Sequence, residues 1–232
     1  MLYSIIATIV ALIFLAAFVL VFVRAGYLNK VLVKLGLKES TASTNWTAFS
    51  WDSCLKKLNY KADIAFFGDS ITRGGDFHEY FKDYKIINLG CTGDNLQAIL
   101  NRVSMVESVA PKKVFLMGGI NALTDFNIEK CTEKFDELIV TLKKAVPDAE
   151  IYIESVLPIS KEKESSVCRN SSIIEFNKKL KELAEKHNLV YIDLHSLYYM
   201  NGEVNPKLTK DGIHIQPEAY SLWKDAIEKY IA

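Results

Sequence analysis

From Asp63 onward, short apolar runs alternate with longer segments in which apolar residues recur every three or four positions. The short runs lack strict alternation with polar residues, which is typical of strands buried on both faces of a parallel sheet. The longer segments have the period of helices that cover such a sheet. The predicted strands are Ile64–Phe67, Lys85–Leu89, Lys113–Met117, Glu150–Val156 and Val190–Asp193, and the predicted helices are Asn95–Val109, Ile128–Ala145, Ser172–His187 and Pro217–Tyr230. This order predicts an α/β fold, a three-layer α/β/α sandwich around a parallel sheet.

The first segment has a different pattern, because Leu2 to Val23 is apolar and carries no charge. A helix of this length spans a hydrocarbon core of about 30 Å. A cleaved signal peptide would have a basic start and a shorter apolar stretch, so we expect an uncleaved transmembrane anchor over residues 1–24. We expect residues 25–50 to form a juxtamembrane linker and residues 51–232 to form one further domain. Lysines recur every four residues early in the linker, which fits either an amphipathic helix on the membrane surface or a solvated helix.

Composition narrows the class of protein. The 28 basic residues equal the 28 acidic residues in number, so the basic excess of a nucleic-acid-binding protein is missing and we expect no nucleic-acid partner. No two of the four cysteines have CxxC spacing, which argues against a zinc ribbon or a thioredoxin-type site. We interpret them mainly as small buried residues, with one disulfide left open if the domain lies outside the cytoplasm.

Four polar stretches occupy positions suited to chemistry. Three of them directly follow predicted strands, and the fourth precedes the last predicted helix. Because parallel strands share a direction, the first three meet at the carboxyl edge of the sheet, where α/β folds bind ligands. The fourth reaches that edge if the last helix packs beside the first strand. The stretches are GDSIT (Gly68–Thr72), NLGCTGDN (Asn88–Asn95), GGINAL (Gly118–Leu123) and DGIH (Asp211–His214).

These stretches contain the parts of a nucleophilic site. Ser70 follows a buried strand, but a serine hydroxyl needs an adjacent base to act as a nucleophile. His214 is the candidate base, and Asp211, three residues earlier, can accept the other imidazole N–H and orient the ring. The candidate oxyanion donors are the backbone N–H groups of Ser70 and Gly93 and the side-chain amide of Asn121.

The four stretches resemble the blocks of SGNH hydrolases, the GDSL type of lipase and esterase. The resemblance runs from about Ala62 to Tyr230 and matches the blocks in order, with Ser70, Gly93, Asn121 and His214 as the four named residues and Asp211 beside the last. It implies a flavodoxin-like sheet of five parallel strands. It also implies ester hydrolysis through an acyl-enzyme, without a metal or a cofactor.

Two positions depart from the commonest family pattern. Ala122 stands where an Asp often follows the third-block Asn, and Arg73 stands where Glu or Gln is frequent. Neither change touches the predicted proton relay. Arg73 is interpreted either as a cation that receives an anionic substrate group or as a solvated surface residue.

Several residues of the same region have structural interpretations. Asp193 and His195 form a competing acid–histidine pair, which we expect to be structural because its spacing puts both side chains on one strand face without a nearby nucleophile. Asp69 is expected to bond the backbone of its own turn. Cys91 is either a small buried residue or a reactive thiol. Asp94 and Asn95 are the candidate caps of the helix that follows them.

The sequence therefore predicts a membrane-anchored serine esterase that acts on small acyl esters, with O-acetyl groups on carbohydrates as the expected substrates. The alternatives are a lysophospholipase or thioesterase acting on lipid-like esters, and a non-catalytic SGNH-fold module that binds glycans or partners. All Lys and Arg residues near the anchor follow it, which by the positive-inside rule places the domain in the cytoplasm. Anchored enzymes of this kind often work outside the membrane, and we favour that extracytoplasmic orientation.

Overall fold

The computed structural model describes residues 54–55, 57–123, 127–164 and 168–231, which all fall within one compact unit. The predicted anchor (1–24) and linker (25–50) lie outside the described residues, so both stay predictions. Within the described part of the chain, no helix is both long and apolar enough to cross a membrane.

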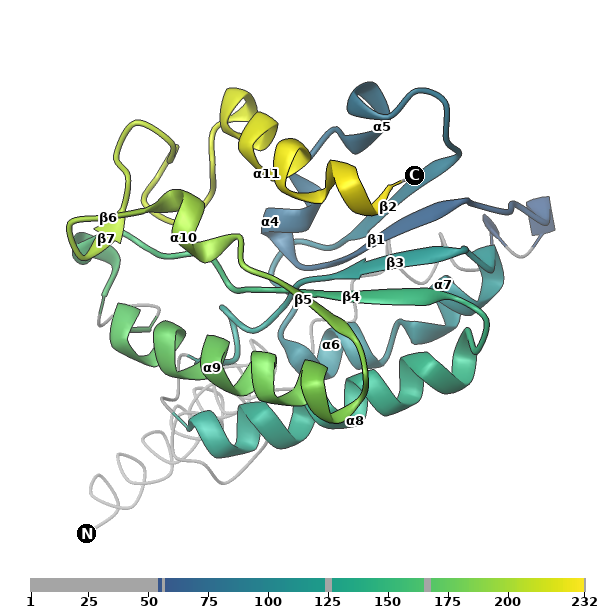
Figure 1. Cartoon of the computed structure of the whole chain (residues 1–232), viewed down its shortest axis with the longest axis horizontal. Helices are drawn as coiled ribbons and strands as arrows, with labels where there is room; N and C mark the ends of the chain where they lie inside the picture. The colour runs from purple at the N-terminus through teal and green to yellow at the C-terminus, as the bar shows by residue number, and fades with distance from the viewer. Residues whose placement is uncertain (1–53, 56, 124–126, 165–167, 232) are drawn as a thin grey trace, which may run out of the picture. The chain divides into compact units, whose positions relative to one another are not determined.

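Five parallel strands form one sheet in the order β2-β1-β3-β4-β5 (Figure 1). This is the flavodoxin-like order that the family resemblance implies, so the predicted sheet is confirmed. The direction of strand succession reverses between β1 and β3, the kind of position at which open α/β sheets bind ligands. The strands are β1 (Ile64–Gly68), β2 (Ile86–Gly90), β3 (Lys113–Leu116), β4 (Glu150–Glu154) and β5 (Val190–Ile192).

Helices cover both faces of the sheet, which confirms the three-layer sandwich. Figure 1 shows α6, α7, α8 and α9 below the sheet and α4, α5 and α11 above it. A short hairpin of β6 (Tyr199–Met200) and β7 (Glu203–Val204) follows α10. The helices are α4 (Ser70–Arg73), α5 (Phe77–Tyr80), α6 (Leu96–Leu100), α7 (Val103–Val109), α8 (Ile128–Ala145), α9 (Asn170–Lys186), α10 (His195–Tyr198) and α11 (Tyr220–Ile227).

Some predicted elements are shorter than expected. The predicted helix over 95–109 is two helices, α6 and α7, separated by Asn101 and Arg102. The predicted strand over 150–156 ends at Glu154, because the Val156 N–H and C=O bond to the Asn177 side chain instead of continuing the ladder. The last predicted helix is α11 flanked by single 3₁₀ turns at Pro217–Ala219 and Glu228–Tyr230.

An aromatic layer fills the core between the sheet and α11. Phe66 of β1 stacks on Phe77 of α5 with ring centroids 3.7 Å apart and lies 5.1 Å from Phe115 of β3. Trp223 of α11 meets the Phe77 ring edge-on at 5.2 Å. Burial of such rings is a main source of folding free energy. Phe77 thus connects α11 to β1, and the segment before α11 reaches the carboxyl edge, where His214 lies beside Ser70.

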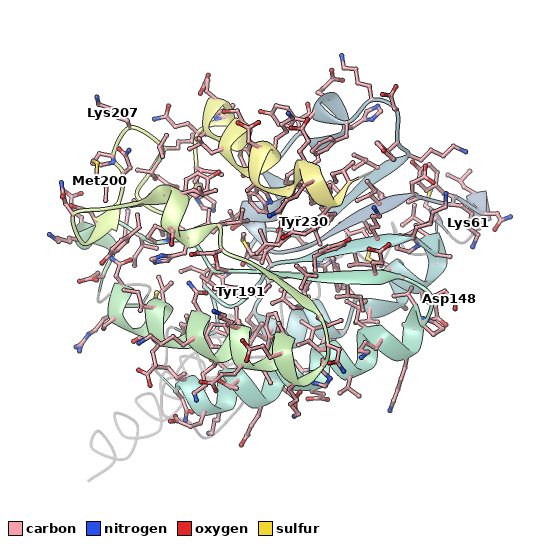
Figure 2. The ribbon with its side chains drawn as sticks, viewed as in Figure 1. Lys61, Asp148, Tyr191, Met200, Lys207 and Tyr230 are labelled. Atoms are coloured by element: carbon pink, nitrogen blue, oxygen red, sulfur yellow. The ribbon has the colours of Figure 1, made fainter. Side chains whose placement is uncertain are left out.

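Side chains occupy the space between the helix layers and the sheet (Figure 2). The C-terminal turn is held to the sheet by Lys113 at the start of β3, whose Nζ donates to the carbonyl oxygen of Tyr230 at 2.9 Å. The Tyr230 ring lies 5.1 Å from that of Tyr152 on β4. These contacts fix the end of the chain against β3 and β4, near the ends at which these strands begin.

Candidate active site

Ser70 is held in a tight turn between β1 and α4. A Cβ atom at Gly68 would lie 2.3 Å from both the carbonyl oxygen of Met117 and the hydroxyl of Thr72, so only glycine fits there. The Asp69 carboxylate accepts the Ile71 N–H at 2.9 Å and caps α4, which confirms its predicted role in the turn. Ser70 is the first residue of α4, and an N–H at that position has no acceptor within its helix.

The structure brings the three predicted catalytic residues together. The Oγ of Ser70 lies 2.9 Å from Nε2 of His214, and Nδ1 of His214 lies 2.8 Å from Oδ2 of Asp211. An ionised carboxylate only accepts hydrogen bonds, so Nδ1 carries the proton toward Asp211 and Nε2 is left to accept from the Ser70 hydroxyl. The imidazole is therefore in the tautomer that a general base requires.

Asp211 is held ionised by its neighbours. Its Oδ1 accepts the backbone N–H groups of Ile213 at 3.0 Å and His214 at 2.8 Å, and its Oδ2 faces the imidazole. Partial burial alone would raise the pKa of Asp211, but these hydrogen bonds outweigh it and lower the pKa to about 2. The carboxylate is therefore ionised at neutral pH, and its side chain keeps 47% of its surface exposed.

The loop that carries His214 is fixed by its own polar contacts. The Thr209 hydroxyl donates to the carbonyl oxygen of His214 at 2.9 Å and accepts the Gly212 N–H at 2.8 Å. The Gly212 carbonyl accepts the Ser160 N–H at 2.8 Å. Gly212 has a φ of +87°, and a Cβ there would lie 2.2 Å from the Ser160 hydroxyl. The turn and the close approach both require glycine.

The predicted oxyanion donors lie on the loops beside Ser70. Gly93, after β2, has a φ of +79° and no heavy atom within 4 Å of the position that its Cβ would take, so its backbone borders open space. The Asn121 amide, after β3, donates to the carbonyl oxygen of Asp94 at 2.9 Å. That bond joins the second and third blocks, and an amide NH₂ has a second hydrogen to direct elsewhere.

Sequence reasoning missed three side chains that hold this arrangement. Asn88 donates to the carbonyl oxygens of Thr72 and Gly75, both at 2.8 Å, and so ties β2 to the chain after the nucleophile turn. The Tyr220 hydroxyl donates to the carbonyl of Ile71. The third is Arg102, whose guanidinium pairs with the Asp94 carboxylate beside Gly93. A polar residue inside an apolar pattern, as at Asn88 and Arg102, is the signal that could have identified them.

Two predictions about the second block have different outcomes. Asn95 caps α6 through an oxygen that accepts the Ala98 N–H at 3.0 Å, as expected. Asp94 does not cap the helix, because its carboxylate pairs with Arg102 instead.

Arg73, at the end of α4, is exposed to solvent.

All four cysteines lie among the described residues and are present as thiols. Cys91, Cys131 and Cys168 are buried and Cys54 is partly buried, and no disulfide joins any of the four. Nor do the described residues include a group of three or more His, Cys, Asp or Glu side chains placed to hold a metal ion.

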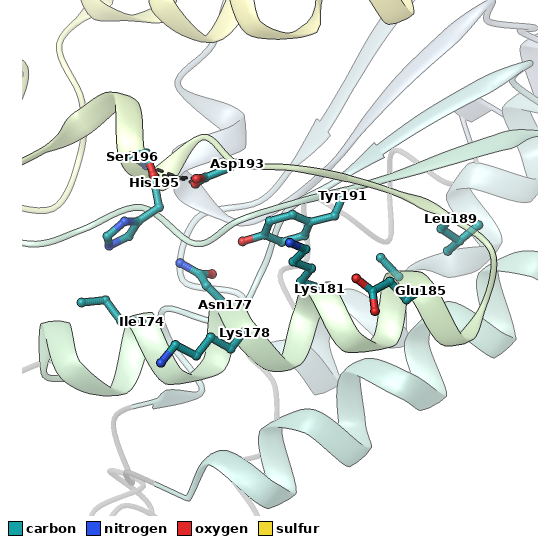
Figure 3. A pocket seen from close by; sticks show the side chains of 11 residues that line it. Ile174, Asn177, Lys178, Lys181, Glu185, Leu189, Tyr191, Asp193, His195 and Ser196 are labelled. Carbon is teal, nitrogen blue, oxygen red and sulfur yellow. Dashed lines mark hydrogen bonds between the residues drawn. The ribbon is translucent and has the colours of Figure 1, made fainter.

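The competing pair Asp193 and His195 lies apart from Ser70. Asp193 follows β5 and accepts the Ser196 hydroxyl at 2.5 Å, while His195 begins α10 and bonds through its backbone N–H to the hydroxyl of Ser155. The expectation that both lie on one strand face is wrong, because β5 ends at Ile192. Both residues line an open groove of about 520 Å³ between the β5 edge and α9 (Figure 3). None of the four blocks contributes to its lining.

A flavodoxin-like fold with a hydrogen-bonded serine, histidine and carboxylate at the carboxyl edge of its sheet is that of an acyl hydrolase. The chain belongs to the GDSL-like lipase/acylhydrolase family, whose sequence profile matches residues 66–222, and it is a carboxylic ester hydrolase. No curated protein sequence gives a significant match to it.

Solved structures share the fold. A GDSL-like lipase from Bacteroides thetaiotaomicron is 20% identical, with a TM-score of 0.69 over 81% of this chain and 97% of that one. A lipase/acylhydrolase from Enterococcus faecalis is 23% identical, with a TM-score of 0.62 over 72% and 94%. The acetyl xylan esterase AlAXEase is 20% identical, with a TM-score of 0.62 over 73% and 99%. At these identities the likeness supports the fold and leaves the substrate to other arguments.

Proposed function

We propose that this chain is a membrane-anchored serine esterase that removes small acyl groups, O-acetyl groups on carbohydrates above all, with its catalytic domain outside the cytoplasm. The observation that carries the proposal is the unbroken chain of hydrogen bonds from Ser70 through His214 to Asp211. We take the substrate class from the acetyl xylan esterase among the proteins that share the fold, and the ester panel below tests that choice. The uncharged segment from Leu2 to Val23 supports the anchor.

The reaction follows from the roles of these residues. As Ser70 Oγ attacks the ester carbonyl carbon, Nε2 of His214 takes the hydroxyl proton and Asp211 stabilises the imidazolium. The backbone N–H groups of Ser70 and Gly93 and the side-chain amide of Asn121 donate hydrogen bonds to the developing oxyanion. Collapse of the tetrahedral intermediate breaks the bond to the leaving oxygen, which takes the proton from His214 and departs as the alcohol.

Deacylation repeats these steps with water. His214 takes a proton from a water molecule as its oxygen attacks the acyl-Ser70 carbonyl. The second tetrahedral intermediate collapses, Ser70 Oγ recovers the proton, and the carboxylic acid is released. The intact triad argues against a non-catalytic binding module, which has no need of all three residues.

The experiment is an ester panel on the full chain in detergent, from p-nitrophenyl acetate to long acyl chains, together with acetylated xylan. Ser70→Ala is the test variant. Ser196→Ala is its matched control, because that hydroxyl also lies beside an acid and a histidine but outside the four blocks. We expect hydrolysis of acetyl esters that Ser70→Ala abolishes and Ser196→Ala retains.

Other outcomes would change the proposal. A preference for long acyl chains would favour the lysophospholipase or thioesterase alternative. No hydrolysis of any ester, or equal hydrolysis by Ser70→Ala, would refute the serine-esterase mechanism. Protease treatment of intact cells tests the orientation, since a domain outside the cytoplasm is digested and a cytoplasmic domain is protected.

A further inference from the structure

Arg102 lies between α6 and α7 with its guanidinium group turned into the protein, and only 11% of its side chain is exposed. It belongs to none of the four sequence blocks. Its Nε donates to Oδ2 of Asp94 at 2.7 Å, and one terminal nitrogen lies 2.6 Å from the same oxygen. The other terminal nitrogen donates to the carbonyl of Leu89 at 2.9 Å. The guanidinium therefore contacts more than one segment of the chain.

A third acceptor connects Arg102 to the nucleophile turn. The terminal nitrogen that faces Asp94 also donates to the carbonyl oxygen of Gly68 at 3.0 Å. Gly68 ends β1 and stands two residues before Ser70. The guanidinium also lies over the Phe67 ring, 5.2 Å from its centroid, which adds a cation–π contact to the same strand. One side chain thus spans the carboxyl ends of β1 and β2.

Asp94 extends the connection to the oxyanion donors. It directly follows Gly93, so the pair with Arg102 restrains the backbone that carries the Gly93 N–H. The carbonyl oxygen of Asp94 accepts the Asn121 amide at 2.9 Å. The first, second and third blocks are therefore joined through Arg102 and Asp94.

The Asp94 carboxylate depends on its partner. Its side chain is only 1% exposed, and burial raises its pKa, an effect that the positive charge and hydrogen bonds of Arg102 oppose. Without the guanidinium, the buried carboxylate would lose its counter-ion and would either take up a proton or draw water into the loop. Either response would move the backbone around Gly93.

From these contacts we propose that Arg102 is a positioning residue, which sets the separation between the Ser70 nucleophile and the oxyanion donors Gly93 and Asn121. The proposal rests on the proposed function, in which Ser70 attacks the ester. Arg102 does not touch the substrate and acts through Gly68 and Asp94. Because small displacements of reacting groups have large effects on rate, loss of this side chain slows the chemical step.

Lysine cannot replace this arginine fully. The guanidinium is a planar fork whose nitrogens reach Asp94, Leu89 and Gly68 at the same time, whereas an ammonium group is a single point charge. Lysine would preserve the ion pair with Asp94 and lose part of the bonding to the two carbonyls. The Arg102→Lys variant therefore separates charge from geometry.

The test compares Arg102→Gln, Arg102→Lys and wild type in the full-length protein, using p-nitrophenyl acetate and a fluorophosphonate that labels Ser70. Rates are expressed per labelled serine, so that unfolded protein does not count. We expect Arg102→Gln to lower kcat by about 100-fold with KM changed by less than about threefold, and to slow labelling in parallel. Arg102→Lys falls between Arg102→Gln and wild type.

The matched control is Lys112→Gln. It removes another ion pair, with Asp63 at 2.9 Å, but an exposed one that lies before β1 and β3 at the opposite edge of the sheet. We expect it to keep the wild-type kcat and labelling rate.

A purely structural role for Arg102 predicts a loss of stability without a loss of kcat. Arg102→Gln would then melt at a lower temperature, but every labelled serine would turn over at the wild-type kcat, and that result would overturn the proposal. If Arg102→Gln does not fold, wild-type kcat and labelling in Arg102→Lys overturn it equally. A wild-type protein that neither cleaves esters nor reacts with the fluorophosphonate would contradict the proposed function instead.

Discussion

Ser70 Oγ and His214 Nε2 lie 2.9 Å apart, although 144 positions separate the two residues in the chain. Ser70 is placed by the turn that ends β1, and His214 by a loop that precedes α11. The two meet because α11 packs on Phe77 of α5, and Phe77 in turn stacks on Phe66 of β1. The chemistry of the site thus depends on the packing of the helix layer above the sheet.

Asp211→Asn tests the orientation of the imidazole. An asparagine keeps the shape of the side chain but can stabilise the wrong tautomer of His214, so we expect kcat to fall about 10³-fold to 10⁴-fold with the fold retained. Steady-state kinetics and circular dichroism measure the two properties. Asp193→Asn, an exposed carboxylate outside the four blocks, is the control. A fall in kcat of less than about tenfold in Asp211→Asn would mean that Asp211 does not orient the His214 imidazole.

Asn121→Ala tests the side-chain oxyanion donor. Removal of one such donor costs about 3 kcal/mol of transition-state stabilisation, so we expect kcat to fall about 100-fold while KM changes little. The exposed Asn101, which accepts the side-chain amide of Gln97, supplies the control variant Asn101→Ala. An Asn121→Ala enzyme with wild-type kcat would remove Asn121 from the oxyanion hole and leave it as a link to Asp94.

Gly93→Ala tests the backbone oxyanion donor. Because Gly93 has a φ of +79° and open space at its Cβ position, alanine would introduce backbone strain of about 1 kcal/mol but no clash. Gly202→Ala is matched, with a φ of +91° and a nearest contact of 3.5 Å in the β6–β7 turn. We expect similar losses in the free energy of unfolding from urea titration. Only Gly93→Ala should also have a lower kcat. Equal kcat values in both variants would argue against Gly93 as an oxyanion donor.

Glu154→Gln tests the pH dependence of stability. Glu154 is fully buried beside Trp223, whose Nε1 donates to it at 2.6 Å, and burial raises the pKa of Glu154 to about 8. The folded state thus binds this proton more tightly than the unfolded state. Its contribution to stability is complete below the ordinary carboxyl pKa of 4.5 and is lost as the pH rises toward about 8, with a slope of up to about 1.4 kcal/mol per pH unit.

The glutamine variant should therefore show a shallower fall in the free energy of unfolding between pH 5 and pH 8. Some slope remains, because burial also raises the pKa of Asp69, to about 7, with the same sign. Urea unfolding at several pH values measures the effect. Glu150→Gln, at the exposed start of β4, provides the comparison, and identical slopes in Glu154→Gln and wild type would show that Glu154 does not titrate in this range.

Much of the fold could be predicted because its signals are local. Each strand is a short apolar run, and α8 and α9 show the helical period over 17 or 18 residues. The break between α6 and α7 could not be read this way. Arg102 lies at this break, and its side chain bonds to Asp94, Leu89 and Gly68, the last of which is 34 positions away in the chain.

The site shows the same division. The GDSIT and DGIH stretches identify Ser70, Asp211 and His214 as candidates, because turn chemistry and the three-residue spacing of acid and base are local properties. Asp94 was assigned a cap that it does not form. A carboxylate beside a helix start is satisfied either by the backbone or by a cation, and Arg102 is brought close enough only by the folded loop.

The sequence by itself determined the order of buried strands and covering helices, the four blocks and the residue types needed for acyl transfer, since each is written within a few consecutive positions. The tertiary structure decided which of these residues meet. It paired His214 with Ser70, turned Asp193 toward Ser196, and placed Arg102 between the nucleophile turn and the oxyanion loop. Such pairings depend on how the layers pack across the sheet, and that packing is a property of the whole chain rather than of any one segment.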